Sequence, residues 1–211
     1  MERPLCWRRR VSFIPVEINS EYFSYERLVD NGNESCMKRF AAINGATGIT
    51  NYFQKQAIKD ENDYSVRNYV VKLKGTEVII ACFTLKCGSI PYNEKAIDLK
   101  FSKETKLVPG LELVNIALND YSLRIIKGFD IKVGRNIFYD IVQPIVKHVS
   151  QEVGTKVLYL FAANQKLAQY YKTWGFYPVE DESFNERLNE DWQSEYSQNC
   201  IFMYKPVAEI E

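Results

Sequence analysis

One acidic residue interrupts a nearly continuous apolar stretch of this sequence and is therefore a candidate for proton chemistry. Glu112 lies in the run 111–118 (LELVNIAL), whose composition is typical of a strand buried on both faces. Apolar neighbours disfavour the charged form of a carboxyl group and raise its pKa, which suits a general base. An equally good interpretation is a glutamate at a strand end that points into solvent or pairs with a lysine.

A second candidate site is the start of a long helix near Gly134. Backbone N–H groups at a helix N-terminus, together with the helix dipole, can bind an anion such as a phosphate group without any particular side chain. Lys132 and Arg135 flank the glycine and could add charge-assisted contacts. We therefore expect Lys132, Val133, Gly134, Arg135 and Asn136 to form an anion-binding turn. A lone glycine before a helix is also typical of a simple turn.

The composition argues against several classes of protein. Lys plus Arg and Asp plus Glu both number 27, so there is no net charge to attract nucleic acid or an acidic membrane. The five cysteines form no CxxC pair and His148 is the one histidine, so no zinc site is expected. No apolar run approaches the roughly 20 residues that span a bilayer. We expect a single cytoplasmic domain over residues 1–211, with no metal and no membrane contact.

Apolar periodicity predicts the elements that must position these candidates. Helices are expected over 47–61, capped by Thr47 or Thr50, over 137–153, ended by Gly154, and over 164–174, ended by Gly175. Strands are expected over 69–73, 78–85, 111–118, 156–163, 177–179 and 200–204, with a loop over 88–110. Pro144 should kink the second helix near Asp140. Right-handed crossover then makes 111–118 and 156–163 parallel neighbours.

The order of these elements and one motif resemble the GNAT acetyltransferases. Residues 164–176 (NQKLAQYYKTWGF) are similar to the superfamily's Asn-x-x-Ala-x-x-x-Tyr-x-x-x-Gly-Phe. They keep Asn164, Tyr171, Gly175 and Phe176, with the alanine shifted and Tyr170 as the alternative tyrosine. In the family's cofactor loop, Gln/Arg-x-x-Gly-x-Gly/Ala, only Gly134 matches. Over residues 69–204 the resemblance implies an α/β fold with a mixed, central, splayed β-sheet flanked by helices.

The resemblance also implies a role for each candidate in acetyl transfer from acetyl-coenzyme A. Glu112 would be the general base, acting on the amine directly or through water, and Tyr171 the acid that protonates the coenzyme A sulfur. Ile116 would offer its N–H to the thioester carbonyl, Leu118 would line the pantetheine arm, and Asn164 would bond the cofactor. The simpler interpretations are core packing for Ile116, Leu118 and Tyr171, and a helix cap for Asn164.

These observations predict an N-acyltransferase that moves an acetyl group from acetyl-CoA to a primary amine of a small molecule or peptide. The turn 44–48 before the first helix also resembles the GNAT subgroup of tRNA-acetylating toxins, so aminoacyl-tRNA is an alternative acceptor, although the neutral charge argues against it. A non-catalytic GNAT-like CoA-binding or regulatory protein is a third interpretation. The acidic stretch 180–195 would favour a cationic amine, or is a solvated loop. A homodimer is compatible with the sequence.

Overall fold

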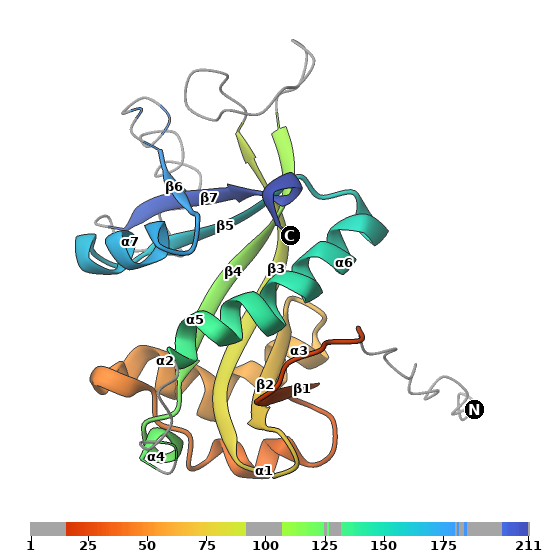
Figure 1. The fold of residues 1–211 in the computed structure, drawn as a ribbon, viewed down its shortest axis with the longest axis vertical. Helices are drawn as coiled ribbons and strands as arrows, with labels where there is room; N and C mark the ends of the chain where they lie inside the picture. Colours follow the sequence, from red (N-terminus) through yellow and green to blue (C-terminus); the bar gives the residue numbers. More distant parts are fainter. Residues whose placement is uncertain are drawn as a thin grey trace, which may run out of the picture.

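The computed structural model describes residues 16–91, 107–124, 126, 132–179, 181, 184 and 200–210. Its centre is a seven-stranded mixed sheet with the strand order β1-β2-β3-β4-β5-β7-β6 (Figure 1). Strands β4 and β5 are parallel, and the other neighbouring pairs are antiparallel. The strands are β1 (Phe23–Arg27), β2 (Arg67–Leu73), β3 (Ile79–Pro91), β4 (Leu107–Leu118), β5 (Val157–Ala162), β6 (Tyr177–Pro178) and β7 (Ile201–Pro206).

The helices lie in two groups, before β2 and after β4. The first group is α1 (Asn33–Met37), η1 (Ile43–Gly45), α2 (Thr47–Asn51), η2 (Tyr52–Gln56) and α3 (Ala57–Asn62). The second is α4 (Asp120–Leu123), α5 (Val133–Ile137), η3 (Phe138–Val142), α6 (Gln143–Val153) and α7 (Gln165–Lys172), and a short turn, η4 (Val207–Glu209), follows β7. Among the described residues, no helix combines the length and the apolar character needed to cross a bilayer.

Most of the predicted elements are confirmed, because long apolar periodicity specifies them. The helix expected over 47–61 runs continuously through α2, η2 and α3, and the predicted strands are all present. The cap predicted for this helix, Thr47 or Thr50, is wrong, because Ala46 occupies the N-cap position. The Thr50 hydroxyl group instead accepts a hydrogen bond from Ala42 N at 3.0 Å. Strand β1 was not predicted, although Phe23 and Tyr25 alternate with polar residues and pack on the same side.

The loop predicted over 88–110 is partly wrong. Strand β3 continues to Pro91 and β4 begins at Leu107, and the two pair as far as Pro91↔Leu107. Figure 1 shows these two strand ends continuing past β5 and β7. Pro109 is tolerated in β4 because the β4–β5 ladder begins only at Gly110, so this stretch lies at an edge of the sheet. The intervening residues 92–106 lie outside the described part of the chain.

The sheet is covered on both faces. On one face, α5, η3, α6 and α7 pack over a core that contains Phe83, Leu113, Ile141 and Trp174. On the other face, the helix over 47–62 covers a second core. A third core is formed around β5 and β7. Figure 1 shows α5 and α6 in front of β3 and β4, with α2 behind them. Strand β4 is therefore buried between helices, as its apolar sequence predicts.

The long helix departs from α geometry where the sequence predicts a kink. A π-helical segment, Phe138–Val142, joins α5 to α6 and contains Asp140. Pro144 follows it, and proline has no N–H to donate to the carbonyl group four residues earlier. The wider π turn accommodates this missing donor. The helix ends at Gly154, whose φ of 75° supplies the expected left-handed cap.

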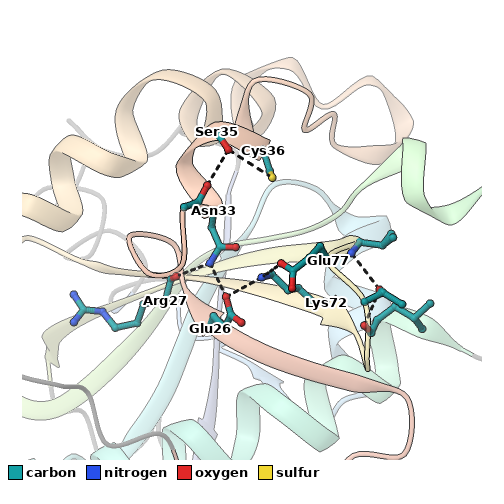
Figure 2. Close-up of polar contacts among 11 residues, drawn as sticks. Glu26, Arg27, Asn33, Ser35, Cys36, Lys72 and Glu77 are labelled. Atoms are coloured by element: carbon teal, nitrogen blue, oxygen red, sulfur yellow. Dashed lines mark hydrogen bonds and ion pairs between the residues drawn. The ribbon is translucent and has the colours of Figure 1, made fainter.

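A buried lysine joins β1, β2 and the turn that precedes β3. The Lys72 side chain is 3% exposed, and its Nζ donates to Glu26 Oε2 at 2.8 Å and to Glu77 Oε2 at 2.6 Å. Asn33 Nδ2 also donates to Glu26, at 2.9 Å, and to the Arg27 carbonyl group. Figure 2 shows Glu26 between Asn33 and Lys72, at the centre of this network. Because each group has a charged or polar partner, the ammonium group can remain buried.

This network predicts how acid affects stability. Burial raises the pKa of Glu26, but the hydrogen bonds from Lys72 and Asn33 outweigh the effect of burial. The pKa of Glu26 is therefore lowered from its ordinary value of 4.5. A carboxyl group with a lowered pKa stabilises the folded state at neutral pH, and this contribution is lost as the pH falls below about 4.5. We expect Glu26→Gln to lower the free energy of unfolding by about 1 to 2 kcal/mol at pH 7.

The measurement is urea unfolding of wild type and Glu26→Gln at pH 7 and at pH 3. The difference between the two proteins should shrink as the pH falls below 4.5, because Glu26 of the wild type takes up a proton as the pH passes through its lowered pKa. Glu34→Gln, at an exposed position in α1, is the control. A Glu26→Gln deficit of the same size at both pH values would contradict this role.

Candidate functional site

The sheet opens between β4 and β5. Their parallel ladder has three residue pairs and ends at Glu112↔Tyr159, after which β5 continues to pair with β7. Strand β4 bulges at the same place: Leu113 and Asn115 face consecutive residues of β3, and Val114 between them has no β3 partner. From Leu113 to Leu118, the edge of β4 that would face β5 is therefore free of strand pairing within the described residues. This is the predicted splay.

The open strand presents different side chains to its two sides. Ile116 and Leu118 pack against the core beneath α5, η3, α6 and α7, on the side where the sequence resemblance implies the cofactor. Asn115 and Ala117 point to the opposite side, since they pair with Thr84 and Cys82, and Cys82 and Ala117 lie in the core beneath the helix over 47–62. Backbone N–H and C=O groups of this edge lie between the two sides.

The end of β4 leads to the start of α5. A Cβ atom placed on Gly134 would lie 3.1 Å from the Tyr170 hydroxyl group, 3.8 Å from the Trp174 ring and 3.9 Å from Leu118. The fold therefore brings together Leu118 and Gly134, two of the predicted residues. It adds Tyr170 and Trp174, which face the glycine from α7 and its C-terminal turn. A Cβ atom at position 134 would be tight against the Tyr170 hydroxyl group, whereas its distances to Trp174 and Leu118 are ordinary van der Waals contacts.

The first turn of α5 has backbone donors that the helix does not use. Lys132 is the N-cap residue and makes no side-chain cap, and the first intrahelical bond runs from Asn136 N to Lys132 O at 3.0 Å. The N–H groups of Val133, Gly134 and Arg135 precede that bond and have no intrahelical acceptor. The Arg135 guanidinium lies 5.4 Å from the centre of the Tyr139 ring. The rest of the predicted loop, 129–131, lies outside the described residues.

The two tyrosines of α7 occupy different environments. Tyr171 is partly buried against Trp174 and Phe176, with ring centres 5.2 Å and 6.1 Å away, and burial raises its pKa to about 12. Its hydroxyl group is therefore protonated at neutral pH. Tyr170 is 45% exposed and has its hydroxyl group beside Gly134. Burial also raises the pKa of Tyr170, while Trp174 and Arg135 oppose that shift.

Asn164 acts as a helix cap in this structure. Its Oδ1 accepts a hydrogen bond from Leu167 N at 3.0 Å, and its extended backbone is typical of an N-cap residue. Capping leaves the Nδ2 group as the donor that could meet a ligand. The structural interpretation of Asn164 is thus confirmed, and its cofactor role stays a prediction.

Glu112 is buried in the middle of β4, at 1% exposure. The interpretation as a strand-end residue pointing into solvent is therefore wrong, because β4 extends five residues before it. Lys86 is its cross-strand partner in β3, so the side chains project from the same face and a lysine partner is geometrically available. Glu112 pairs with Tyr159 of β5 at the last position before the splay. In the described ranges, no group of three or more His, Cys, Asp or Glu side chains could hold a metal ion.

A buried lysine fixes the end of α7. Lys205 of β7 is 6% exposed, and its Nζ donates to the Trp174 carbonyl group at 3.1 Å, at the negative end of the helix. Gly175 follows with φ of 81°, and a Cβ atom there would lie 2.5 Å from Lys205 Nζ. Glycine is therefore required at position 175 for two reasons: its backbone is left-handed, and the Lys205 side chain occupies the space that a Cβ atom would fill.

The sequence matches no protein-family model and no curated protein, whereas solved structures match it over most of its length. A mutant AtaT toxin bound to the C-terminus of the antitoxin AtaR and acetyl-CoA is 19% identical, with a TM-score of 0.62, and the match covers 90% of this chain and 96% of that one. A mutant of KacT is 15% identical, with a TM-score of 0.63 and coverage of 90% and 98%. AtaT complexed with acetyl-methionyl-tRNAfMet is 19% identical, with a TM-score of 0.60 and coverage of 89% and 96%. Likeness at these identities establishes the fold alone, which is the one that the sequence resemblance predicts.

The environment of Gly175 predicts a specific loss of stability. Gly175→Ala should lower the free energy of unfolding by more than the 1 to 2 kcal/mol that a left-handed backbone roughly costs an alanine, because Lys205 must also move. Gly154→Ala is the matched control, since φ is 75° there and no atom lies within 4 Å of its Cβ position. Urea unfolding of both variants gives the comparison. Equal losses would mean that Lys205 does not constrain position 175.

Proposed function

We propose that this GNAT-fold chain transfers an acetyl group from acetyl-CoA to a primary amine bound at the same time. The observation that carries the proposal is the proximity of the open edge of β4, which ends at Leu118, to the first turn of α5 at Gly134; the line from one to the other is called the cofactor path. Backbone N–H groups that are used neither by the helix nor by the β4–β5 ladder lie at its two ends. The solved AtaT structure with acetyl-CoA, which shares the fold, supports the same ligand here.

Each end of the path suits a different part of acetyl-CoA. The N–H groups of Val133, Gly134 and Arg135 would bind the pyrophosphate, and the helix dipole favours its negative charge. Lys132 and Arg135 would add charge-assisted contacts. Ile116 and Leu118 would contact the pantetheine arm, and the Ile116 N–H would donate to the thioester carbonyl oxygen. Asn164 Nδ2 and Asn136 would add polar contacts. Bound in this way, the cofactor supplies an activated acetyl carbon.

Two side chains are proposed to move protons. Glu112 would accept a proton from the amine, directly or through water, because an ammonium group has no lone pair with which to attack. Tyr171 would donate a proton to the departing sulfur, which its raised pKa allows because the phenol is protonated at neutral pH. Backbone donors at the β4 edge would stabilise the negative charge that develops on the thioester oxygen.

The acceptor is proposed to be a primary amine of a small molecule or peptide. The second candidate is the α-amino group of an aminoacyl-tRNA, which AtaT complexed with acetyl-methionyl-tRNAfMet favours. Equal numbers of acidic and basic residues favour the first candidate, because tRNA affinity depends on phosphate neutralisation. Most of the acidic stretch 180–195 lies outside the described residues, so its effect on the acceptor stays a prediction.

One experiment separates these functions. Purified protein is incubated with acetyl-CoA and, in parallel, with spermidine, a lysine-containing peptide, methionine amide or methionyl-tRNA. Free thiol release reports turnover, and mass spectrometry identifies the acetylated product. Transfer to spermidine or the peptide supports the first acceptor class, and transfer to methionyl-tRNA the second. Binding of acetyl-CoA in calorimetry without thiol release in any reaction would indicate a non-catalytic CoA-binding protein.

Gly134→Leu tests the pyrophosphate site. A leucine side chain would extend from a Cβ position that already lies 3.1 Å from the Tyr170 hydroxyl group and would obstruct the first turn of α5, so we expect acetyl-CoA affinity to fall by roughly tenfold or more, about 1.4 kcal/mol. Calorimetric titration measures this, and thermal unfolding reports whether the fold survives. Gly48→Leu is the matched control, because Gly48 is also the second residue of a helix and has open space around it. Unchanged affinity in Gly134→Leu would rule out this site.

Tyr171→Phe tests the proposed acid. Removing a proton donor that acts only in the transition state should lower kcat by about 10²-fold or more, with acetyl-CoA affinity nearly unchanged. Tyr170→Phe is the control, because its hydroxyl group lies beside Gly134 and should influence cofactor binding more than turnover. A fall in kcat in Tyr170→Phe but not in Tyr171→Phe would assign the proton donor to Tyr170.

A further inference from the structure

A row of polar residues crosses the sheet and ends at the open edge of β4. Asn68 of β2 pairs with Thr84 of β3, and Thr84 pairs with Asn115 of β4. Side chains at paired positions project from the same face, here the face covered by the helix over 47–62. Asn68 and Thr84 are fully buried, whereas Asn115 is half-buried. The row therefore leads from the interior of the sheet to the splay.

Hydrogen bonds fix the orientation of every group at the buried end of the row. Asn68 Nδ2 donates to the Ala57 carbonyl group at 2.8 Å, so its Oδ1 is the acceptor for the hydroxyl groups of Thr84, at 2.7 Å, and Tyr52, at 3.3 Å. Asn68 N donates to Glu61 Oε2 at 2.5 Å, and Glu61 forms an ion pair with Arg27. Because the Asn68 amide cannot rotate without losing its Ala57 bond, both hydroxyl protons point into the core.

This arrangement leaves the Tyr52 oxygen able to accept a hydrogen bond, because its proton is donated to Asn68. Burial raises the pKa of Tyr52, and its polar contacts with Asn68 and Thr84 oppose that shift. The phenol stays protonated at neutral pH, and its single proton is used by Asn68. The lone pairs that remain on the oxygen can accept a hydrogen bond from another group. An amine, with two or more N–H donors, is such a group.

The helix that carries Tyr52 is locally widened. Tyr52–Gln56 is a π-helical segment within the helix over 47–62. No proline lies in this helix, in contrast to the other π-helical segment, where Pro144 accounts for the geometry. Single π turns inside α-helices occur frequently at functional sites. Here the segment places Tyr52 over Asn68 and Thr84, while Phe53 packs into the core.

We propose that Asn115 and Tyr52 form the subsite that holds the amino group of the acceptor, on the opposite side of β4 from the cofactor path. The inference rests on the proposed function. Ile116 and Leu118 face the cofactor side, so the amine approaches the acetyl carbon from the Asn115 side. Glu112 projects to the same face as Asn115, because the bulge at Val114 shifts the alternation of side chains between these two residues by one position. Asn115 Oδ1 and the Tyr52 oxygen accept N–H bonds and favour primary amines over tertiary amines.

Tyr52→Phe and Asn115→Ala test this subsite with spermidine and methionine amide as acceptors. One lost hydrogen bond of about 0.5 to 1.5 kcal/mol corresponds to an increase in acceptor KM of about 2- to 13-fold. We expect that increase in each variant, with the dissociation constant of acetyl-CoA nearly unchanged. Tyr52→Phe also loses the bond to Asn68, so its unfolding temperature should fall by roughly 2 to 4 °C. Tyr64→Phe is the control, because Tyr64 is 80% exposed and lies in the turn before β2.

The outcomes distinguish this inference from the proposed function. Unchanged acceptor KM in both variants overturns the subsite, even if wild type transfers acetyl groups. A parallel rise in the acetyl-CoA dissociation constant also overturns it, because the residues would then belong to the cofactor side. Should wild type transfer acetyl to no amine, the proposed function fails, and calorimetric titration of spermidine into the CoA-bound protein tests the subsite directly. In that case, equal affinity of wild type and Tyr52→Phe overturns it.

Discussion

The separation of β4 from β5 after Glu112↔Tyr159 is the constraint on which the rest of this structure depends. Had the parallel ladder continued, β5 would occupy the edge of β4 from Leu113 to Leu118 and consume its backbone donors. The bulge at Val114 bends β4 at that point, and β5 retains a full partner in β7. The sheet loses some ladder hydrogen bonds there and gains a strand edge whose backbone groups are not used by β5.

Aromatic packing and one buried cation keep the opening in place. Trp174 stacks on Phe138 of the long helix, with ring centres 4.6 Å apart, and Tyr170 lies 5.0 Å from Trp174. These contacts bring the C-terminal part of α7 against the start of α5, where Gly134 leaves room for the Tyr170 hydroxyl group. Lys205 holds the Trp174 carbonyl group from β7. The packing of α7 against the long helix thus also assembles the candidate site.

Strand β4 divides the candidate chemistry between its two sides. Its alternation places apolar Ile116 and Leu118 beneath α5, η3, α6 and α7, and polar Asn115 beneath the helix over 47–62. The bulge shifts this alternation by one residue, which is why Glu112 and Asn115 share a face although their spacing in a regular strand would put them on opposite faces. An acid, an amide and a phenol therefore gather on the side away from the cofactor path.

The sequence by itself determined the elements whose signals are local. Apolar periodicity predicted the helices over 47–61 and 137–153 and the buried strands, and glycine predicted the helix ends at Gly154 and Gly175, because side-chain burial and backbone handedness act over a few residues. Tertiary structure alone decided the contacts across the splay. No local pattern reveals that Tyr170, rather than Tyr171, faces Gly134. None shows that Lys205 occupies the space beside Gly175. Nor does any reveal the bulge at Val114, which aligns Asn115 with Thr84. These depend on register and packing between segments distant in the chain, and within a strand a shift of one residue would send each side chain to the other face.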